Sequence, residues 1–349
     1  MTSPAPHTTL DLPPGPDNPR NSEGSFLGLE DGRILYVYSH YTGDSSGDHD
    51  PAFLAGRYST DEGRRWSAED AVVLENEGDW NVMSVSFLRL LDGAIALFYV
   101  RKNSEEDCIP QMRISHDEGG SWSDPNPVIT DREGYFVLNN DRVVQLENGR
   151  LLAPVALHRP RGEPWTNHAT LLVYASDDGG KSWWASDPVP NPEGVLLQEP
   201  GLIPLADGRL LMFIRTDAGV QFFSESRDGG RRWTPVTPGN LPSPVSPASV
   251  KRIPETGDLL AVWNANDGSD PAIAGKRTPL CLAVSADEGR SWSPPRTLAD
   301  NPYGWYCYTA IHFTEDQHVL LSYCCGDTRE NNGLAHSCVT RVSLDWIYR

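Results

Sequence analysis

The chain has 349 residues, a formal net charge of −19 and a hydrophobic content of 38%. No segment approaches the roughly 18 consecutive apolar residues that a membrane helix needs, so we expect a soluble globular protein. The sequence offers no basic face for nucleic acid, and its acidity disfavours long polyanionic substrates.

The N-terminal segment MTSPAPHTTLDLPPGP has neither the basic nor the apolar region of a secretory signal. We therefore expect a cytoplasmic protein, or a secreted one if a leader preceded this sequence. The six cysteines form no C-x-x-C pair and no cluster with zinc-ligand spacing, so free, partly buried thiols are expected. Neither a metal nor another cofactor is implied, because the Asp-rich segment 44–50 lacks EF-hand spacing.

A short acidic motif, Ser-x-Asp-x-Gly-x-x-Trp, returns five times along the chain. Its aspartate can accept hydrogen bonds from backbone N–H groups of its own turn, and its glycine supplies a backbone angle that other residues avoid. The tryptophan can then pack back as an apolar plug. Five equivalent copies cannot converge on one substrate, so we expect a structural role. The copies are STDEGRRW (59–66), SHDEGGSW (115–122), SDDGGKSW (176–183), SRDGGRRW (226–233) and SADEGRSW (285–292).

A second signature, a polar turn leading into an apolar strand, occurs six times at intervals of roughly 50–60 residues, a period typical of repeat architectures. Each unit contains four short strand patterns, and helical periodicity is nearly absent. The pattern predicts an all-β fold, a six-bladed β-propeller with four-stranded antiparallel blades. The turns begin LEDGRILYVY (29–38), LLDGAIALFYV (90–100), LENGRLLAPVA (146–156), LADGRLLMFIR (205–215), ETGDLLAVWN (255–264) and TEDQHVLLSY (314–323).

The sixth unit has no acidic box, although its last segment, 334–348, still has a strand pattern. We expect the N-terminal segment to complete the last blade and close the ring. An incomplete propeller would expose the edges of its sheets. The prediction is therefore a single domain over residues 1–349.

Polar side chains recur at the starts of the predicted inner strands and in the loops beside them. Charges at such positions need partners, and clustered carboxylates, arginines and tyrosines perturb one another's pKa values as catalytic groups do. The candidates in chain order are Arg20, Glu23, Asp48, His49, Asp50, Asn81, Asn140, Glu199, Arg215, Arg277, Tyr306 and Tyr308.

This combination of boxes and inner-strand residues resembles the sialidase (neuraminidase) superfamily of six-bladed propellers, whose Asp-box or BNR repeats match the five boxes. The resemblance covers almost the whole chain and implies a retaining glycosidase with a tyrosine nucleophile. Tyr308 fits the nucleophile, with Tyr306 as the second candidate, and Glu199 fits the base that takes its proton. Asp48 fits the acid/base at the leaving oxygen, with Asp50 next.

The resemblance also implies that arginines bind a substrate carboxylate, for which Arg215 and Arg277 fit. Sialidases carry a third such arginine in an R-I-P motif at the start of the first blade. Here the segment reads SEGSF, so Ser22 or Glu23 stands at that place and Arg20 lies a few residues earlier. The substrate is then sialic acid, with Arg20 completing the triad, or another terminal sugar accommodated by Glu23. The predicted substrate-binding set is Arg20, Glu23, His49, Asn81, Asn140, Arg215, Arg277 and Tyr306.

The sequence thus predicts an exo-acting retaining glycoside hydrolase of sialidase type, with a carbohydrate substrate and no nucleic-acid or membrane partner. One alternative is a lyase acting on a uronate-containing sugar, in which Tyr308 and a histidine, His49 or His158, are the acid and base. The other is a non-catalytic sugar-binding propeller, which would not need the set of Glu199, both arginines and Tyr308. No oligomeric state is predicted.

Overall fold

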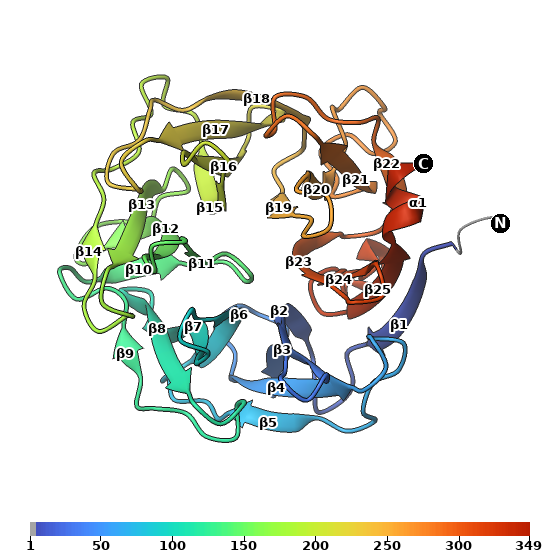
Figure 1. Cartoon of the computed structure of the whole chain (residues 1–349), viewed down its shortest axis with the longest axis horizontal. Helices are drawn as coiled ribbons and strands as arrows, with labels where there is room; N and C mark the ends of the chain where they lie inside the picture. Colours follow the sequence, from blue (N-terminus) through green and yellow to red (C-terminus); the bar gives the residue numbers. More distant parts are fainter. Residues whose placement is uncertain (1–4) are drawn as a thin grey trace.

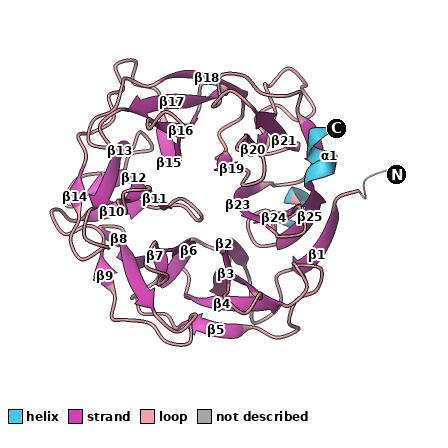
Figure 2. Ribbon diagram, viewed as in Figure 1, coloured by secondary structure: helices cyan, strands magenta, loops and turns pink. Residues whose placement is uncertain are grey.

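The computed structural model describes residues 5–349, which form antiparallel sheets with very little helix. Figure 1 shows the sheets following one another around a ring in chain order, and Figure 2 shows how small the helical share is. The two helical segments are a 3-10 turn at Thr328–Glu330 and α1 at Leu344–Tyr348. Neither of these helices is long or apolar enough to span a bilayer.

Three sheets of four strands are each built from consecutive strands that pair with their neighbours in the chain. The first strand of each sheet lies toward the centre of the ring and the fourth toward its rim (Figure 1). The sheets are β2 (Asn21–Gly28), β3 (Ile34–Tyr41), β4 (Ala52–Ser59) and β5 (Ala71–Leu74); β15 (Leu197–Pro204), β16 (Leu210–Thr216), β17 (Val220–Ser226) and β18 (Thr237–Pro242); and β19 (Ser249–Arg252), β20 (Leu259–Asn264), β21 (Leu280–Ser285) and β22 (Arg296–Ala299).

The second part of the ring is one nine-stranded sheet. It contains two antiparallel runs, which a single parallel pairing of Tyr135 with Cys108 joins into one sheet. The first run is β6 (Asn81–Arg89), β7 (Ile95–Ser104), β8 (Asp107–Ser115) and β9 (Asn126–Pro127). The second is β10 (Gly134–Val137), β11 (Val144–Gln145), β12 (Leu151–Pro160), β13 (Thr170–Ser176) and β14 (Trp184–Ala185).

The last sheet combines the two ends of the chain. Strands β23 (Cys307–Phe313), β24 (His318–Cys324) and β25 (Ser337–Ser343) pair in order, and β1 (His7–Leu12) pairs with β25 at the outer edge. The partners run from His7 with Arg341 to Leu12 with Ser337. This pairing covers the edge of β25 and links the first residues of the ring to the last.

Apolar clusters fill the interfaces between successive sheets, which explains why many strands are buried along their whole length. Strand β20, LLAVWN, is buried at every position because sheets pack on both of its faces. Leu35 and Val37 of β3 share a cluster with Val85 and Leu97 of the next sheet. Similar clusters join the sheets of β12 and β16, and those of β3 and β24.

The five acidic boxes form the same turn at five places. In the box at 176–183 the Ser176 hydroxyl donates to Asp178 Oδ1 over 2.8 Å and accepts from the Gly180 N–H over 2.8 Å. Asp178 Oδ1 also accepts from the Ser182 N–H over 2.9 Å. The other four boxes have equivalent bonds, and each box tryptophan packs against an apolar cluster. The boxes therefore fix turns between strands.

Candidate active site

A repeated backbone irregularity directs side chains from the inner strands. Strands β2, β6, β15 and β23 each have a break in register, and within each break lies a non-glycine residue with positive φ. These residues are Glu23 (φ 57°), Ser84 (φ 62°), Glu199 (φ 48°) and Tyr308 (φ 56°). A bulge of this kind re-aims a side chain, at a cost of about 1–3 kcal/mol for the strained backbone. The same device is thus used to turn four polar side chains in one direction.

All four of these side chains line one cavity of about 300 Å³. Other lining residues come from β7, β10, β12, β16 and the loops near them, so several sheets of the ring contribute to a single site. Cavities that collect a few convergent polar groups with perturbed pKa values are the usual place for binding and catalysis. The polar and aromatic members include Glu23, Asp48, Ser84, Lys102, Tyr135, Phe136, Asn139, His158, Trp165, Gln198, Glu199, Arg215, Arg277 and Tyr308.

Tyr308 and Glu199 form the centre of this cavity. The Tyr308 hydroxyl donates to Glu199 Oε1 over 3.1 Å, and Arg215 Nη1 lies 2.7 Å from Glu199 Oε2. Burial alone would favour the protonated carboxyl, but the charges of Arg215 and Arg277 and the hydrogen bond from Tyr308 hold the pKa of Glu199 below its ordinary value. Burial and the Glu199 carboxylate raise the pKa of Tyr308. The pair is therefore a neutral phenol facing an ionised carboxylate at neutral pH.

Arg277 is a cavity residue with an open donor. Its guanidinium lies 4.8 Å from the ring centre of Trp305 and 5.7 Å from that of Tyr308, and the residue is 8% exposed. Among the described residues, its buried Nη1 has no hydrogen-bond partner, and neither has Nε of Arg215. Buried donors normally have partners, so these two nitrogens are suited to an acceptor that enters the cavity.

Glu23 also lines the cavity and forms an ion pair with Arg20, which does not line it. All three guanidinium nitrogens of Arg20 are engaged: Nε with Ser22 over 2.9 Å, Nη1 with Asp48 over 2.5 Å and Nη2 with Glu23 over 3.0 Å. Arg20 is 1% exposed and does not line the cavity, whereas Glu23 does. Burial raises the pKa of Glu23, although the Arg20 charge acts in the opposite direction. Ser84 donates its hydroxyl to the other oxygen of Glu23.

Asp48 lies at the mouth of the cavity, on the loop between β3 and β4, with its side chain 58% exposed. Partial burial opposes its ionisation, but the charges of Arg20 and Lys102 hold the pKa of the carboxyl below its ordinary value. Lys102 Nζ donates to the backbone oxygen of Asp48 over 3.0 Å and faces the Tyr135 ring at 5.5 Å. This places an ionised, accessible carboxylate beside the cavity.

Several predicted substrate-binding residues lie outside the cavity and have other tasks. The Asn81 amide donates to the backbone oxygens of Asp48 and Asp50, so it fixes the loop that carries both. The Asn140 amide donates to the backbone oxygens of Gly24 and Tyr308, so it holds two inner strands together.

Tyr306 packs in an apolar cluster next to Tyr323, away from the cavity. Asp50 accepts hydrogen bonds within its own loop, from Ser45 and from the Gly47 N–H. His49 is exposed and stacks on Trp80 at 4.1 Å. Tyr306, Asp50 and His49 thus do not line the cavity of Tyr308 either.

The lining also contains residues that were not predicted, among them Ser84, Lys102, Tyr135 and Trp165. Lys102 lies near the end of β7, the second strand of its run, and Arg215 lies near the end of β16, the second strand of its sheet. This equivalent position is the sequence signal that could have identified Lys102. Trp165 is 47% exposed, stacks on His158 at 4.9 Å and contacts the edge of Tyr135. These rings give the cavity an apolar rim. In the sequence, nothing distinguishes Trp165 from any other tryptophan in a loop, so its place at this rim could not be predicted.

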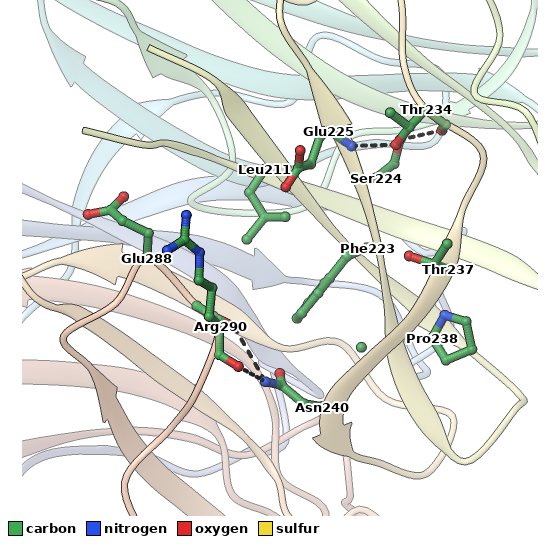
Figure 3. Close-up of a pocket in the computed structure, with 12 residues that line it drawn as sticks. Leu211, Phe223, Ser224, Glu225, Thr234, Thr237, Pro238, Asn240, Glu288 and Arg290 are labelled. Carbon is green, nitrogen blue, oxygen red and sulfur yellow. Dashed lines mark hydrogen bonds between the residues drawn. The ribbon is translucent and has the colours of Figure 1, made fainter. Parts of the chain in front are cut away.

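A second cavity of about 380 Å³ lies at the outer part of the ring, between β16–β18 and the turn of the fifth box (Figure 3). Its wall includes Leu211, Phe223, Glu288 and Arg290, and Asn240 donates to the backbone oxygen of Arg290 over 2.8 Å. None of the predicted site residues lines it. Only two neighbouring sheets contribute, so it does not combine groups from around the ring.

The sequence pattern of the BNR repeat-like domain matches residues 45–321, well over half of the chain. The chain belongs to this BNR-repeat family, within the sialidase-like superfamily. Two sialidases are similar to the BNR chain in sequence, one from Vibrio cholerae serotype O1 (strain ATCC 39315 / El Tor Inaba N16961) and one from Bacteroides fragilis (strain YCH46). Each is 25% identical to this chain. The alignment with the Vibrio cholerae sialidase covers 213 residues and 54% of the chain, and that with the Bacteroides fragilis sialidase covers 207 residues and 56% of the chain. The alignments span only 26% and 36% of these longer relatives.

Several solved structures share the fold of this chain over nearly its whole length. A Dyadobacter fermentans protein of unknown function is 18% identical with a TM-score of 0.76, covering 97% of the chain and 99% of that protein. The leech intramolecular trans-sialidase, solved with 2,7-anhydro-Neu5Ac, is 16% identical with a TM-score of 0.73, covering 95% and 69%. A Ruminococcus gnavus intramolecular trans-sialidase is 15% identical with a TM-score of 0.73, covering 95% and 96%.

Proposed function

We propose that this protein is an exo-acting retaining glycoside hydrolase of sialidase type. The observation that carries the proposal is the hydrogen bond from Tyr308 to Glu199 inside a cavity that also contains Arg215 and Arg277. Tyrosine nucleophiles are the recognised exception to the two-carboxylate rule for glycosidases. The sialidases similar to this chain favour the same assignment.

In the first half-reaction the Tyr308 oxygen attacks the anomeric carbon of the terminal sugar, and its proton passes to Glu199. The bond from that carbon to the leaving oxygen breaks, and the leaving oxygen takes a proton from Asp48. In the second half-reaction Asp48 takes a proton from water, which attacks the same carbon and displaces the Tyr308 oxygen. Glu199 then returns its proton to the tyrosine, and the anomeric configuration is retained.

Two features of the cavity fit these roles. Glu199 is ionised beside a neutral phenol, which is the resting state that a base and its nucleophile need. Asp48 is accessible at the mouth, where a leaving group departs. The Arg20 charge favours ionised Asp48, which suits the water-activating step, and an anionic sugar in the cavity would favour the protonated form needed first.

The substrate we propose is a terminal sugar with an anionic group toward Arg277 and Arg215 and hydroxyl groups toward Glu23. Arg20 is held by Glu23, Asp48 and Ser22, so it has no guanidinium nitrogen left for a substrate carboxylate. Glu23 is an acceptor for a sugar hydroxyl and repels a second negative charge. Both sialic acid and a different acidic sugar remain substrates to be compared.

The six-bladed count belongs to this proposal as well. We count the nine-stranded sheet as two blades, because its two antiparallel runs are joined only through β8 and β10. With the three sheets of consecutive strands and the sheet closed by β1, the ring then has six blades.

A panel of aryl glycosides tests the function directly. The panel contains a sialoside, a uronide and neutral hexosides. Each substrate is tested with the wild type and with the Tyr308→Phe variant, which is the inactive control. We expect turnover of at least one acidic glycoside with retention of configuration, and its loss in the variant. Sugar binding without turnover of any member would instead identify a carbohydrate-binding propeller.

One observation favours a second candidate, a lyase acting on a uronate-containing sugar. His158 lines the same cavity as Tyr308, and burial lowers the pKa of its imidazole, so it is a neutral base. Its Nδ1 is hydrogen-bonded to the backbone oxygen of Thr166 over 2.9 Å, which leaves Nε2 as the acceptor. A lyase product absorbs in the ultraviolet through its new double bond, whereas a hydrolysis product does not.

A further inference from the structure

Four side chains of types that can ligate a metal ion share one face of the sheet that closes the ring. In the pairing of β1 with β25, Asp11 is directly opposite Cys338. His336 precedes Cys338 by two residues, so both point to the same face. The Cys325 N–H donates to the backbone oxygen of His336, which continues the pairing of β24 with β25 beyond Cys324 and Ser337. Cys325 therefore lies opposite His336, on the face that also carries Asp11 and Cys338.

The donor atoms are close together. His336 Nε2 lies 2.6 Å from Asp11 Oδ1, and one donor atom from each of Asp11, Cys325 and His336 lies within 4.8 Å of the other two. Cys338 is directly opposite Asp11 and also pairs with Tyr323, two residues before Cys325, so its side chain is directed to the same face as these donor atoms. In a tetrahedral zinc site, bonds of about 2.0–2.3 Å place the ligand atoms about 3.3–3.8 Å apart. Shifts of an ångström or so would meet that geometry.

The chemistry of the four donors selects the ion. Thiolates and imidazole are the ligands of structural zinc sites, and a carboxylate also serves as one. Calcium and magnesium prefer sites made of oxygen ligands, which this set does not offer. The site also combines buried and accessible members, because Cys338 is 5% exposed whereas the Asp11 side chain is 61% exposed. An ion could thus enter from the Asp11 side.

We propose that Asp11, Cys325, His336 and Cys338 bind one Zn²⁺ ion. The ion connects β1 with the ends of β24 and β25, so it fastens the first strand of the chain to the last sheet. Its position is separate from the cavity of Tyr308, and the inference does not depend on the proposed hydrolase. The spacing of cysteines and histidines does not indicate the site, because Asp11 and His336 are 325 positions apart.

Zinc content and thermal unfolding of the reduced full-length protein test the site. After loading with Zn²⁺ and desalting, we expect one equivalent of zinc per chain, and a higher Tm than after treatment with a chelator. With Co²⁺ in place of zinc, thiolate charge-transfer absorption and tetrahedral ligand-field bands should appear. The variants Cys325→Ser and His336→Ala should retain less zinc and lose the Tm increase.

The matched control is Cys281→Ser, which changes a buried cysteine of β21 in another sheet and should keep the zinc and the Tm increase. If Cys325→Ser fails to fold, His336→Ala alone provides the comparison, since its side chain is on the partly exposed side of the site. The proposal is overturned if the loaded wild type keeps no zinc, or if both variants keep as much as the wild type. A Cys325–Cys338 disulfide in the freshly purified protein, found by mass spectrometry, would overturn it too.

Discussion

Tyr308 and Glu199 are 109 positions apart in the chain, yet the phenol donates a hydrogen bond to the carboxylate over 3.1 Å. Glu199 is buried and Tyr308 partly buried, and both have positive φ at a break in the register of an inner strand. Two sheets of the ring thus use the same bulge to bring together a potential nucleophile and its base. Strained backbone that recurs at one site is expected where function requires a particular side-chain direction.

Removing either member of this pair should abolish or greatly reduce turnover. For Tyr308→Phe we expect no detectable turnover of an aryl glycoside, since the attacking oxygen is gone. For Glu199→Gln we expect kcat to fall by roughly 10²- to 10⁴-fold, the usual contribution of general acid–base catalysis. Steady-state kinetics and circular dichroism of each variant provide the measurement.

The control for this pair is Tyr306→Phe, because Tyr306 lies in the apolar cluster beside Tyr323. This variant should keep nearly full activity. If Tyr308→Phe were as active as the wild type while Tyr306→Phe were inactive, the roles of the two tyrosines would have to be exchanged.

Arg277 should determine the affinity for a negatively charged sugar. In Arg277→Lys the fork of donors is lost, and a hydrogen bond to a charged group contributes about 1.5–3 kcal/mol. We therefore expect KM for an acidic aryl glycoside to rise roughly 10- to 150-fold, with a much smaller effect on the methyl ester of the same sugar. The comparison of the two substrates is the measurement.

Lys276→Ala is a suitable control for the overall loss of charge, because Lys276 is adjacent in sequence but does not line the cavity. It should leave both KM values nearly unchanged. Equal losses for the acid and for its ester in Arg277→Lys would mean that the guanidinium shapes the cavity without binding a carboxylate.

The repeat explains why so much of the arrangement was predictable from sequence. Its phase identified Glu199, Arg215, Arg277 and Tyr308 without any information on contacts, and the structure brings all four to one cavity. The hydrogen bonds of the boxes also follow from residue type, because a serine and an aspartate in a tight turn have few other partners. A local motif that recurs at a fixed position in each repeat therefore allows equivalent positions to be identified around the whole ring.

The direction of the side chains was harder to predict. A bulge changes which residues of a strand face the cavity, and no residue type in this sequence marks where the bulges lie. Glu23 points into the cavity from the bulge of β2, while Arg20, three residues earlier, is enclosed behind it. Asn81 and Asn140 have the expected place in the chain, but their amides satisfy backbone oxygens. Which polar group meets substrate and which one holds the backbone depends on such partners, and the sequence does not specify them.

The pH dependence of catalysis should report the charge state of Glu199. The lowered pKa means that the base stays ionised below the value of about 4.3 of an ordinary glutamate. Activity limited by this group should therefore be present above that value and be lost only as the pH falls past the pKa of Glu199. The acid limb of kcat/KM, with recovery checked after return to neutral pH, gives the measurement.

Arg215→Met should move this acid limb to higher pH, because a positive charge 2.7 Å from the carboxylate is removed. The matched substitution Arg209→Met changes the arginine just before the same strand, which binds Asp207 and Glu225 far from Glu199 in the register. It should leave the limb where it is. An unmoved limb in Arg215→Met would assign the acid limb to another group, such as Asp48.

The boxes should make the stability of the fold sensitive to acid. The hydroxyl and N–H of the serine four residues after the aspartate, and the hydroxyl of the serine two residues before it, donate hydrogen bonds that lower the pKa of Asp117, Asp178 and Asp287 to about 2. In the unfolded chain an aspartate has a pKa of about 3.9, so the folded state binds these protons less readily. The contribution to stability is complete above the unfolded value and is lost as the pH falls through the folded one. We expect Tm to decline between about pH 4 and pH 2.

The variant Asp178→Asn should have a lower Tm at neutral pH and a shallower decline, because Ser182 and Ser176 lose a charged acceptor. Asp44→Asn, which changes an exposed aspartate outside the boxes, should reproduce the wild-type curve. Calorimetry of the three proteins over this pH range measures the effect, and parallel curves for Asp178→Asn and the wild type would show that the boxes fix the turns without contributing to acid sensitivity.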